Sequence, residues 1–188
     1  MTNEEGTLVR TSISALLITV LGLVAAIAVP SAHANDPCAA FTWDVSHERT
    51  LFRGEPKSLH AGQTVAASPK LAIDRLYQLQ LKRQPEVVYV APPRSKSGID
   101  GGYAGLASLA VKTTGLYRIA LDQPLWIDVV ANGSLVLAKD FQGRRGCNSP
   151  HKIVEFELPA GIPLTLQFSG GSTSMVKVVV TRSSAKAS

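Results

Sequence analysis

The sequence predicts an all-β protein, an antiparallel β-sandwich with one short helix near its N-terminus. From Leu71 onward, apolar and polar residues alternate with a period of two in short segments. Turn sequences such as Asn-Gly, Pro-Ala-Gly and Gly-Gly separate these segments at fairly regular intervals. Each segment therefore has one apolar and one polar face, as expected of sheets that bury only one side.

Residues 1–34 have the pattern of a secretory signal peptide. An apolar run from Ile13 to Val29 is followed by Pro30 and by the Ala32-His33-Ala34 motif. We expect cleavage after Ala34, and a periplasmic or secreted protein with no stable membrane span. The alternative is an uncleaved anchor, because the start of the chain is poor in basic residues and the run is nearly long enough to cross a bilayer.

The remainder has the length of one domain with a real core. We expect an N-terminal segment over 35–60 that contains the short helix, a β-sandwich over 61–182 and a disordered tail over 183–188. The formal net charge of +5 is spread along the chain without a block of Lys and Arg. This distribution favours solubility and weak attraction to anionic surfaces, so no nucleic-acid partner is expected.

Cys38 and Cys147 are the two cysteines of the chain. In an oxidising compartment such a pair is predicted to form a disulfide, here closing a loop of about a hundred residues. It would attach the N-terminal segment to the loop that follows Phe141. The alternative, a reactive or metal-bound thiol, lacks both CxxC spacing and a neighbouring pair of His ligands.

A short helix is predicted from Val45 to Phe52, ended by Gly54. Val45, Leu51 and Phe52 would share one side of it. Asp44 stands where an N-cap or first-turn acid belongs, and it lies four residues before Glu48. Capping is favoured over the alternative that these two acids form a catalytic pair.

The first strand is predicted over 76–81, with Tyr77, Leu79 and Leu81 on one face. A second strand is predicted over 87–90, ended by two prolines. Residues 94–105 are predicted to form a polar, glycine-rich loop. Strands over 106–111 and 116–121 follow it.

The segment 125–137 is predicted to form a β-hairpin around Asn132-Gly133, the strongest short signal for a type I′ turn. The two-residue turn sets the register, so Trp126 would lie across from Lys139 and Asp128 across from Leu137. A Trp–Lys pair in this position is a cross-strand cation–π contact.

Three further strands complete the predicted sandwich. Their inward-facing residues are Val154, Phe156 and Leu158; Leu164, Leu166 and Phe168; and Val176, Val178 and Val180.

The run TTGLYRIALDQPLWIDVV and the later run FELPAGIPLTLQFSGGSTSMVKVVV together resemble bacterial pre-peptidase C-terminal domains, which are small secreted jelly-roll domains of exported enzymes. The resemblance covers about half of the chain. The segment CAAFTWDVSHE is similar to that of a group of exported proteobacterial proteins with no established activity, some of which carry an automated homogentisate dioxygenase label. These resemblances imply a jelly-roll-like sandwich and an exported location, and no chemistry.

No catalytic residue, metal or cofactor is predicted. His47, His60 and His151 have no spacing that would bring two of them and a carboxylate to one iron, so they are interpreted as surface residues. The sequence contains no GxSxG motif for a nucleophile. The glycines of 98–103 have no following helix and no Lys-Ser/Thr, so they do not indicate a phosphate-binding loop.

The candidate ligand-binding residues are Trp126, Asp128 and Lys139 on the hairpin, and Arg94 and Tyr103 on the loop. A Trp ring can stack on a sugar while a carboxylate accepts its hydroxyls. The favoured alternative is that this face is covered by the helix, because other apolar residues share it. Trp126 would then be buried, and Asp128 would accept a hydrogen bond from a backbone N–H, Arg49 or Arg118.

The sequence thus favours an exported, non-enzymatic β-sandwich protein. Its expected partner is a glycan or small ligand, or another envelope protein. The alternative is a metal-dependent enzyme such as a dioxygenase, which rests on the label of similar proteins and on no motif in this chain.

Overall fold

The computed structural model describes residues 36–95 and 101–183. The expected leader, its cleavage site after Ala34, most of the expected tail and residues 96–100 of the glycine-rich loop lie outside the described residues. Within those two ranges, no helix is long and apolar enough to cross a membrane.

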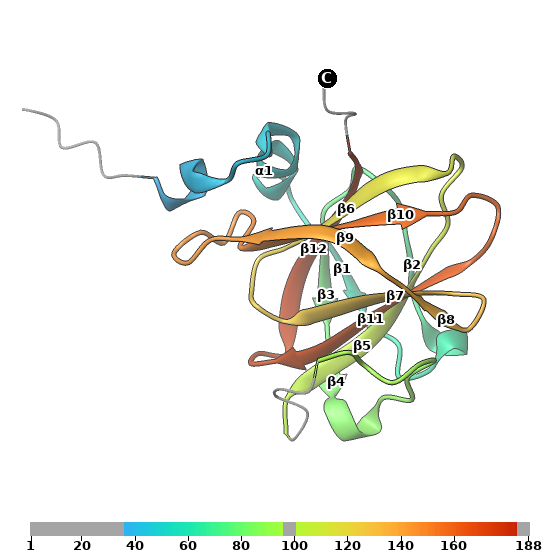
Figure 1. Cartoon of the computed structure of the whole chain (residues 1–188). Helices are drawn as coiled ribbons and strands as arrows, with labels where there is room; N and C mark the ends of the chain where they lie inside the picture. Colours follow the sequence, from blue (N-terminus) through green and yellow to red (C-terminus); the bar gives the residue numbers. More distant parts are fainter. Residues whose placement is uncertain (1–35, 96–100, 184–188) are drawn as a thin grey trace, which may run out of the picture. The chain divides into compact units, whose positions relative to one another are not determined.

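The structure is all-β, as predicted, and its elements are labelled in Figure 1. The helical elements are η1 (Pro37–Ala40), α1 (Ser46–Phe52), η2 (Val65–Ala67) and η3 (Gln84–Glu86). The strands are β1 (Lys57–His60), β2 (Lys70–Leu71), β3 (Tyr77–Gln80), β4 (Lys82–Arg83), β5 (Tyr103–Leu109), β6 (Gly115–Leu121), β7 (Trp126–Ala131), β8 (Ser134–Val136), β9 (Ala138–Gly143), β10 (Lys152–Leu158), β11 (Leu164–Gly171) and β12 (Met175–Arg182).

The strands form two sheets of a sandwich. Sheet A has the order β1-β3-β12-β6-β10-β9, and sheet B has the order β2-β5-β11-β7-β8, with β4 paired to β5. Most pairs are antiparallel, but β1 pairs with β3 and β2 pairs with β5 in parallel, so the expectation of purely antiparallel sheets is wrong at these two edges. Both parallel pairs are joined by long connections, which parallel pairing requires.

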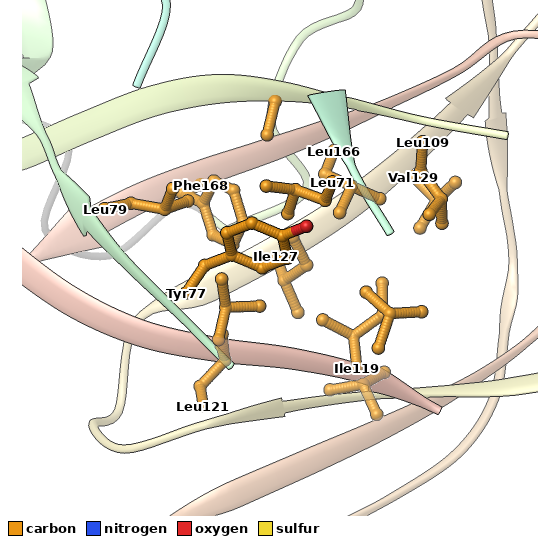
Figure 2. Close-up of a cluster of buried hydrophobic side chains, with 14 of the residues drawn as sticks. Leu71, Tyr77, Leu79, Leu109, Ile119, Leu121, Ile127, Val129, Leu166 and Phe168 are labelled. Carbon is orange, nitrogen blue, oxygen red and sulfur yellow. The ribbon is translucent and has the colours of Figure 1, made fainter. Parts of the chain in front are cut away.

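The core lies between the sheets and is built from the predicted inward-facing residues. Leu79, Ile119, Val129, Leu166 and Phe168 all have no accessible surface. Figure 2 shows these side chains meeting from strands of both sheets. The alternation read from the sequence is therefore confirmed in these strands.

The predicted strand over 87–90 is wrong. Residues 87–95, which we call the strap, cross the outer face of sheet B without pairing to a strand. Val87 packs on Ala104 and Leu106 of β5, which explains its apolar character. The backbone of the strap is bonded instead to the side chain of Gln167, and the Val88 N–H donates to the Gln63 carbonyl at 2.8 Å.

The loop predicted over 94–105 also ends earlier than expected. Strand β5 covers Tyr103–Leu109 rather than 106–111, because Tyr103 and Ala104 pair with β4 on one side and Tyr103 pairs with β11 on the other. Gly105 lies within this strand, and a side chain there is excluded because a Cβ would lie 2.4 Å from the Cβ of Ala61. Close packing, rather than a turn, accounts for this glycine.

The N-terminal segment carries the predicted helix. Asp44 precedes it, and its carboxylate accepts a hydrogen bond from the Ser46 N–H at 2.9 Å, which lowers the pKa of Asp44. Val45 and Phe52 of this segment pack with Ala120 and Val179. The helix therefore covers the outer face of sheet A, and the expectation that it packs on the face of Trp126 is wrong.

A buried ionic cluster lies under the helix. Glu48 is 2% exposed, and one of its oxygens accepts a hydrogen bond from the Thr181 hydroxyl at 2.7 Å. The Arg118 guanidinium lies 3.8 Å from the same oxygen and 3.3 Å from a Glu155 oxygen, and it stacks on the Trp43 ring. Glu48 is thus separated from the exposed Asp44, and the two do not form the carboxylate pair considered above.

The predicted disulfide between Cys38 and Cys147 is present. Next to it, Thr42 and the buried Gln142 of β9 exchange two hydrogen bonds, of 2.9 Å and 2.6 Å. The N-terminal segment is therefore attached to sheet A by a covalent bond, a hydrogen-bonded pair and the ionic cluster.

The double variant Cys38→Ser/Cys147→Ser should lose stability because its unfolded chain is no longer cross-linked. The chain-entropy model gives about 5 kcal/mol for the 109-residue separation. Urea unfolding of the oxidised protein and of the variant measures the difference. Reductant should destabilise only the parent protein; equal midpoints for parent and variant would contradict the prediction.

Arg118→Met should cost about 3 kcal/mol or more, because it leaves two largely buried carboxylates without their cation. Arg145→Met, at an exposed position, is the matched control and should change the free energy of unfolding by less than about 0.5 kcal/mol. Both values come from urea denaturation. Similar effects of the two substitutions would show that the cluster does not hold the helix.

Candidate functional site

The hairpin at Asn132-Gly133 forms as predicted, with positive φ at both residues. Its register is confirmed as far as Val136, which pairs with Val129. Beyond Val136 the predicted register is wrong, because the chain leaves sheet B and continues in sheet A as β9. Lys139 therefore does not face Trp126; its ammonium lies 3.0 Å from the Glu157 carboxylate.

A pocket lies at the side of the sandwich where β8 ends sheet B and β9 ends sheet A, and it is lined by residues of both sheets and of the strap. We call it the edge pocket. Its volume is about 220 Å³. It is lined by Arg94, Trp126, Ile127, Asp128, Val136, Ala138, Phe141, Lys152, Val154 and Phe156.

Two exposed aromatic side chains line the edge pocket. Trp126 at the start of β7 is 38% exposed, so the expectation that it is covered is wrong. Phe141 on β9 is 68% exposed and pairs directly with Val154 of β10, which places it on the side of the sheet that faces the core. Strand β9 is the end strand of sheet A, so Phe141 has a neighbouring strand on one side only.

Lys152 stands at the wall of the pocket next to Trp126. Its ammonium lies 4.9 Å from the centroid of the indole ring and donates to the Leu125 carbonyl at 3.3 Å. Removal from water lowers the pKa of Lys152, and the negative charge of Asp128 acts in the opposite direction. The cation–π partner of Trp126 is thus Lys152 of β10, not the predicted Lys139.

Asp128 is 3% exposed, and its carboxylate accepts a hydrogen bond from the Arg94 N–H at 3.1 Å. A backbone N–H is one of the partners predicted for it; Arg49 bonds Asp36 instead, and Arg118 belongs to the ionic cluster. The bond fixes the end of the strap against β7. It also places Arg94 at the edge pocket.

A second hollow of about 260 Å³ adjoins the edge pocket. Trp126 and Lys152 line both, so these two side chains form the wall between them. The other residues of the second hollow are Ser95, Pro124, Leu125, Ser169 and Gly170.

The structure brings three of the five candidate residues together: Arg94, Trp126 and Asp128 line the edge pocket. Lys139 does not line it and belongs to a shallower hollow with Glu157. Tyr103 does not line it either, and its ring is covered by the Arg83 guanidinium at 5.0 Å.

Sequence reasoning missed Phe141 and Lys152. Both had a signal in the sequence: Phe141 is the one aromatic residue in a polar run, and Lys152 is in phase with the inward-facing Val154 and Phe156. A lysine at an inward-facing position breaks the alternation of apolar and polar residues, and a partly buried charged residue of this kind is a candidate for ligand binding.

The three histidines that the structure describes do not line this pocket. His47 is bonded to Asp74 at 2.8 Å, His151 to the Cys147 carbonyl at 3.1 Å, and His60 is exposed on β1. Among the residues that the structure describes, no three His, Cys, Asp or Glu side chains are placed to hold a metal ion.

Neither a protein-family model nor a curated protein matches this chain. Among solved structures, a β-glucosidase from Paenibacillus barengoltzii is similar at 13% identity and a TM-score of 0.27. The match covers 67% of this chain and 13% of the β-glucosidase chain. A similarity this weak supports no conclusion about fold or activity, so the argument for a function depends on the edge pocket itself.

Gln167→Leu should free the strap, because it removes the partner of the Val90 and Ala91 N–H groups and of the Ala91 carbonyl. Leaving these groups unpaired should cost about 1–3 kcal/mol. Hydrogen exchange at Val90 and Ala91 should accelerate, and urea unfolding gives the free energy.

Gln78→Leu on β3 is the matched control, since no hydrogen bond to its side chain is seen among the described residues. It should leave both amides protected. Unchanged exchange in Gln167→Leu would show that the strap is held by other contacts.

Proposed function

We propose that this protein is a non-catalytic binding protein of the cell envelope, and that its edge pocket takes one sugar unit of an envelope glycan. The observation that carries the proposal is the pair of exposed aromatic side chains, Trp126 and Phe141, that line one small apolar pocket. Exposed aromatic residues at a concave site are typical of ligand binding.

The chemistry of the pocket suits a sugar ring. The apolar C–H face of a sugar can pack on an aromatic ring, while its hydroxyls need donors and acceptors at the rim. Arg94, Asp128 and Lys152 supply polar groups there. At about 220 Å³, the pocket is smaller than the roughly 300–1,000 Å³ of sites for drug-sized ligands, which favours a single ring over a long chain.

The disulfide supports an oxidising compartment. Together with the leader expected over 1–34, it supports a periplasmic or secreted location. A glycan of the envelope is therefore a ligand that such a protein would meet.

A protein partner is the second candidate. Leu137, which joins β8 to β9, is 59% exposed beside the edge pocket, and β8 and β9 are the end strands of their sheets. An end strand can pair with an extended segment of another chain. The metal-dependent enzyme has no set of ligands among the described residues to support it.

Trp126→Ala should weaken the binding of a neutral monosaccharide glycoside at least tenfold, which corresponds to about 1.4 kcal/mol, because the stacking surface is lost. Titrations followed by the amide signals of Ile127 and Phe141 in NMR spectra measure the affinity.

Leu116→Ala is the matched control, because Leu116 is 39% exposed on β6, outside the edge pocket. It should bind as the parent does. If titration of the parent protein with monosaccharide glycosides does not shift these signals, the glycan proposal fails and the exposed edge is to be tested as a protein interface.

A further inference from the structure

Lys152 occupies a position that a core-forming strand normally gives to an apolar residue. It is in phase with Val154 and Phe156, whose side chains are buried between the sheets. A lysine is removed from water here only at a cost, which a partner of opposite charge would offset.

The described part of the chain compensates Lys152 only through weak contacts, which are the indole ring of Trp126, 4.9 Å from the ammonium, and one hydrogen bond. An ammonium group has three donors, and the one hydrogen bond seen for it is long, 3.3 Å to the Leu125 carbonyl. None of the ion pairs among residues 36–95 and 101–183 includes Lys152. Asp128 is the neighbouring acid, and its carboxylate is engaged by the Arg94 N–H.

The ammonium group of Lys152, which has no ion-pair partner among the described residues, lies where a bound ligand can reach it. The side chain belongs to the wall shared by the edge pocket and the second hollow. Arg94 adds a second cation at the edge pocket, held there by the bond of its N–H to Asp128. The pocket thus offers an aromatic surface and a rim on which two cations, Arg94 and Lys152, outnumber the one acid, Asp128.

Building on the function proposed above, we propose that the edge pocket selects a sugar unit that bears a carboxylate, with the sugar ring against Trp126 and Phe141 and the carboxylate accepting hydrogen bonds from Lys152. A hexuronic acid unit of an acidic polysaccharide has this chemistry. Arg94 serves as the second donor. A neutral hexose fits the same ring position but leaves Lys152 without its anion.

The test compares methyl glucuronide with methyl glucoside, which share a ring and differ in a carboxylate against a hydroxymethyl group. The oxidised full chain carries Trp43→Phe, so that Trp126, the second of two tryptophans, is the fluorescent reporter. At low ionic strength the glucuronide should bind at least tenfold more tightly, and added salt should reduce this preference.

Lys152→Met should remove the preference and keep the binding of the glucoside, whereas Lys152→Arg should retain the preference. Lys139→Met is the matched control: Lys139 is an exposed lysine on β9 that does not line the edge pocket. It should leave both affinities unchanged. Melting temperatures of all three variants show whether each is folded.

The outcomes separate the two proposals. Equal affinity for the two sugars, unaffected by Lys152→Met, would overturn the selection of acidic sugars and leave the glycan function standing. Absence of binding for both sugars would overturn both proposals. Phenylacetate is the third probe, and tighter binding of this aromatic acid than of the glucuronide would overturn the sugar assignment while keeping Lys152 as the anion-binding group.

Discussion

The edge pocket depends on one feature of the chain: it leaves sheet B after Val136 and enters sheet A at Ala138. The switch makes β8 the end strand of sheet B and β9 the end strand of sheet A. Side chains on the inner face of a strand are normally buried by the opposite sheet. Here Phe141 is 68% exposed and Lys152 of β10 is only partly covered, so this part of the inner face lines the edge pocket.

Polar side chains on the outer face of sheet B bind the backbone of the strap. Gln167 is 1% exposed and Asp128 is 3% exposed, and both are satisfied by the backbone of the strap. Buried polar groups of this kind are tolerated because they are hydrogen-bonded. The hydrogen bond to Asp128 thus has two effects: it fixes the strap, and it places Arg94 at the edge pocket.

The parts of the fold that could be predicted depend on local chemistry. Asn132-Gly133 sets its own turn and the adjoining pairs, and the alternation of β10, β11 and β12 follows from burial of one face. The prediction failed where partners are distant in the sequence. A run such as 87–90 has the composition of a strand, but whether a neighbouring strand is available to pair with it cannot be read from its own residues.

The same division applies to the site. A Trp and an acid on one face of a strand, as at Trp126 and Asp128, can be recognised in the sequence as a candidate site. The predicted pairing of Lys139 with Trp126 required the hairpin to continue beyond Val136, which it does not. Lys152 lies in a strand whose inward-facing positions are predicted correctly, and a lysine at one of these positions is the informative feature.

The N-terminal segment bears on the site through β9. Phe141 and Gln142 are neighbours on this strand and point to opposite faces, Phe141 to the edge pocket and Gln142 to Thr42. Arg144, just beyond β9, donates to the Ala40 carbonyl at 2.6 Å, and the disulfide follows at Cys147. An end strand paired on one side only is among the least stable parts of a sheet. By holding its outer face, the segment from Cys38 to Thr42 fixes the strand that carries Phe141, so the disulfide stabilises the geometry of the pocket as well as the fold.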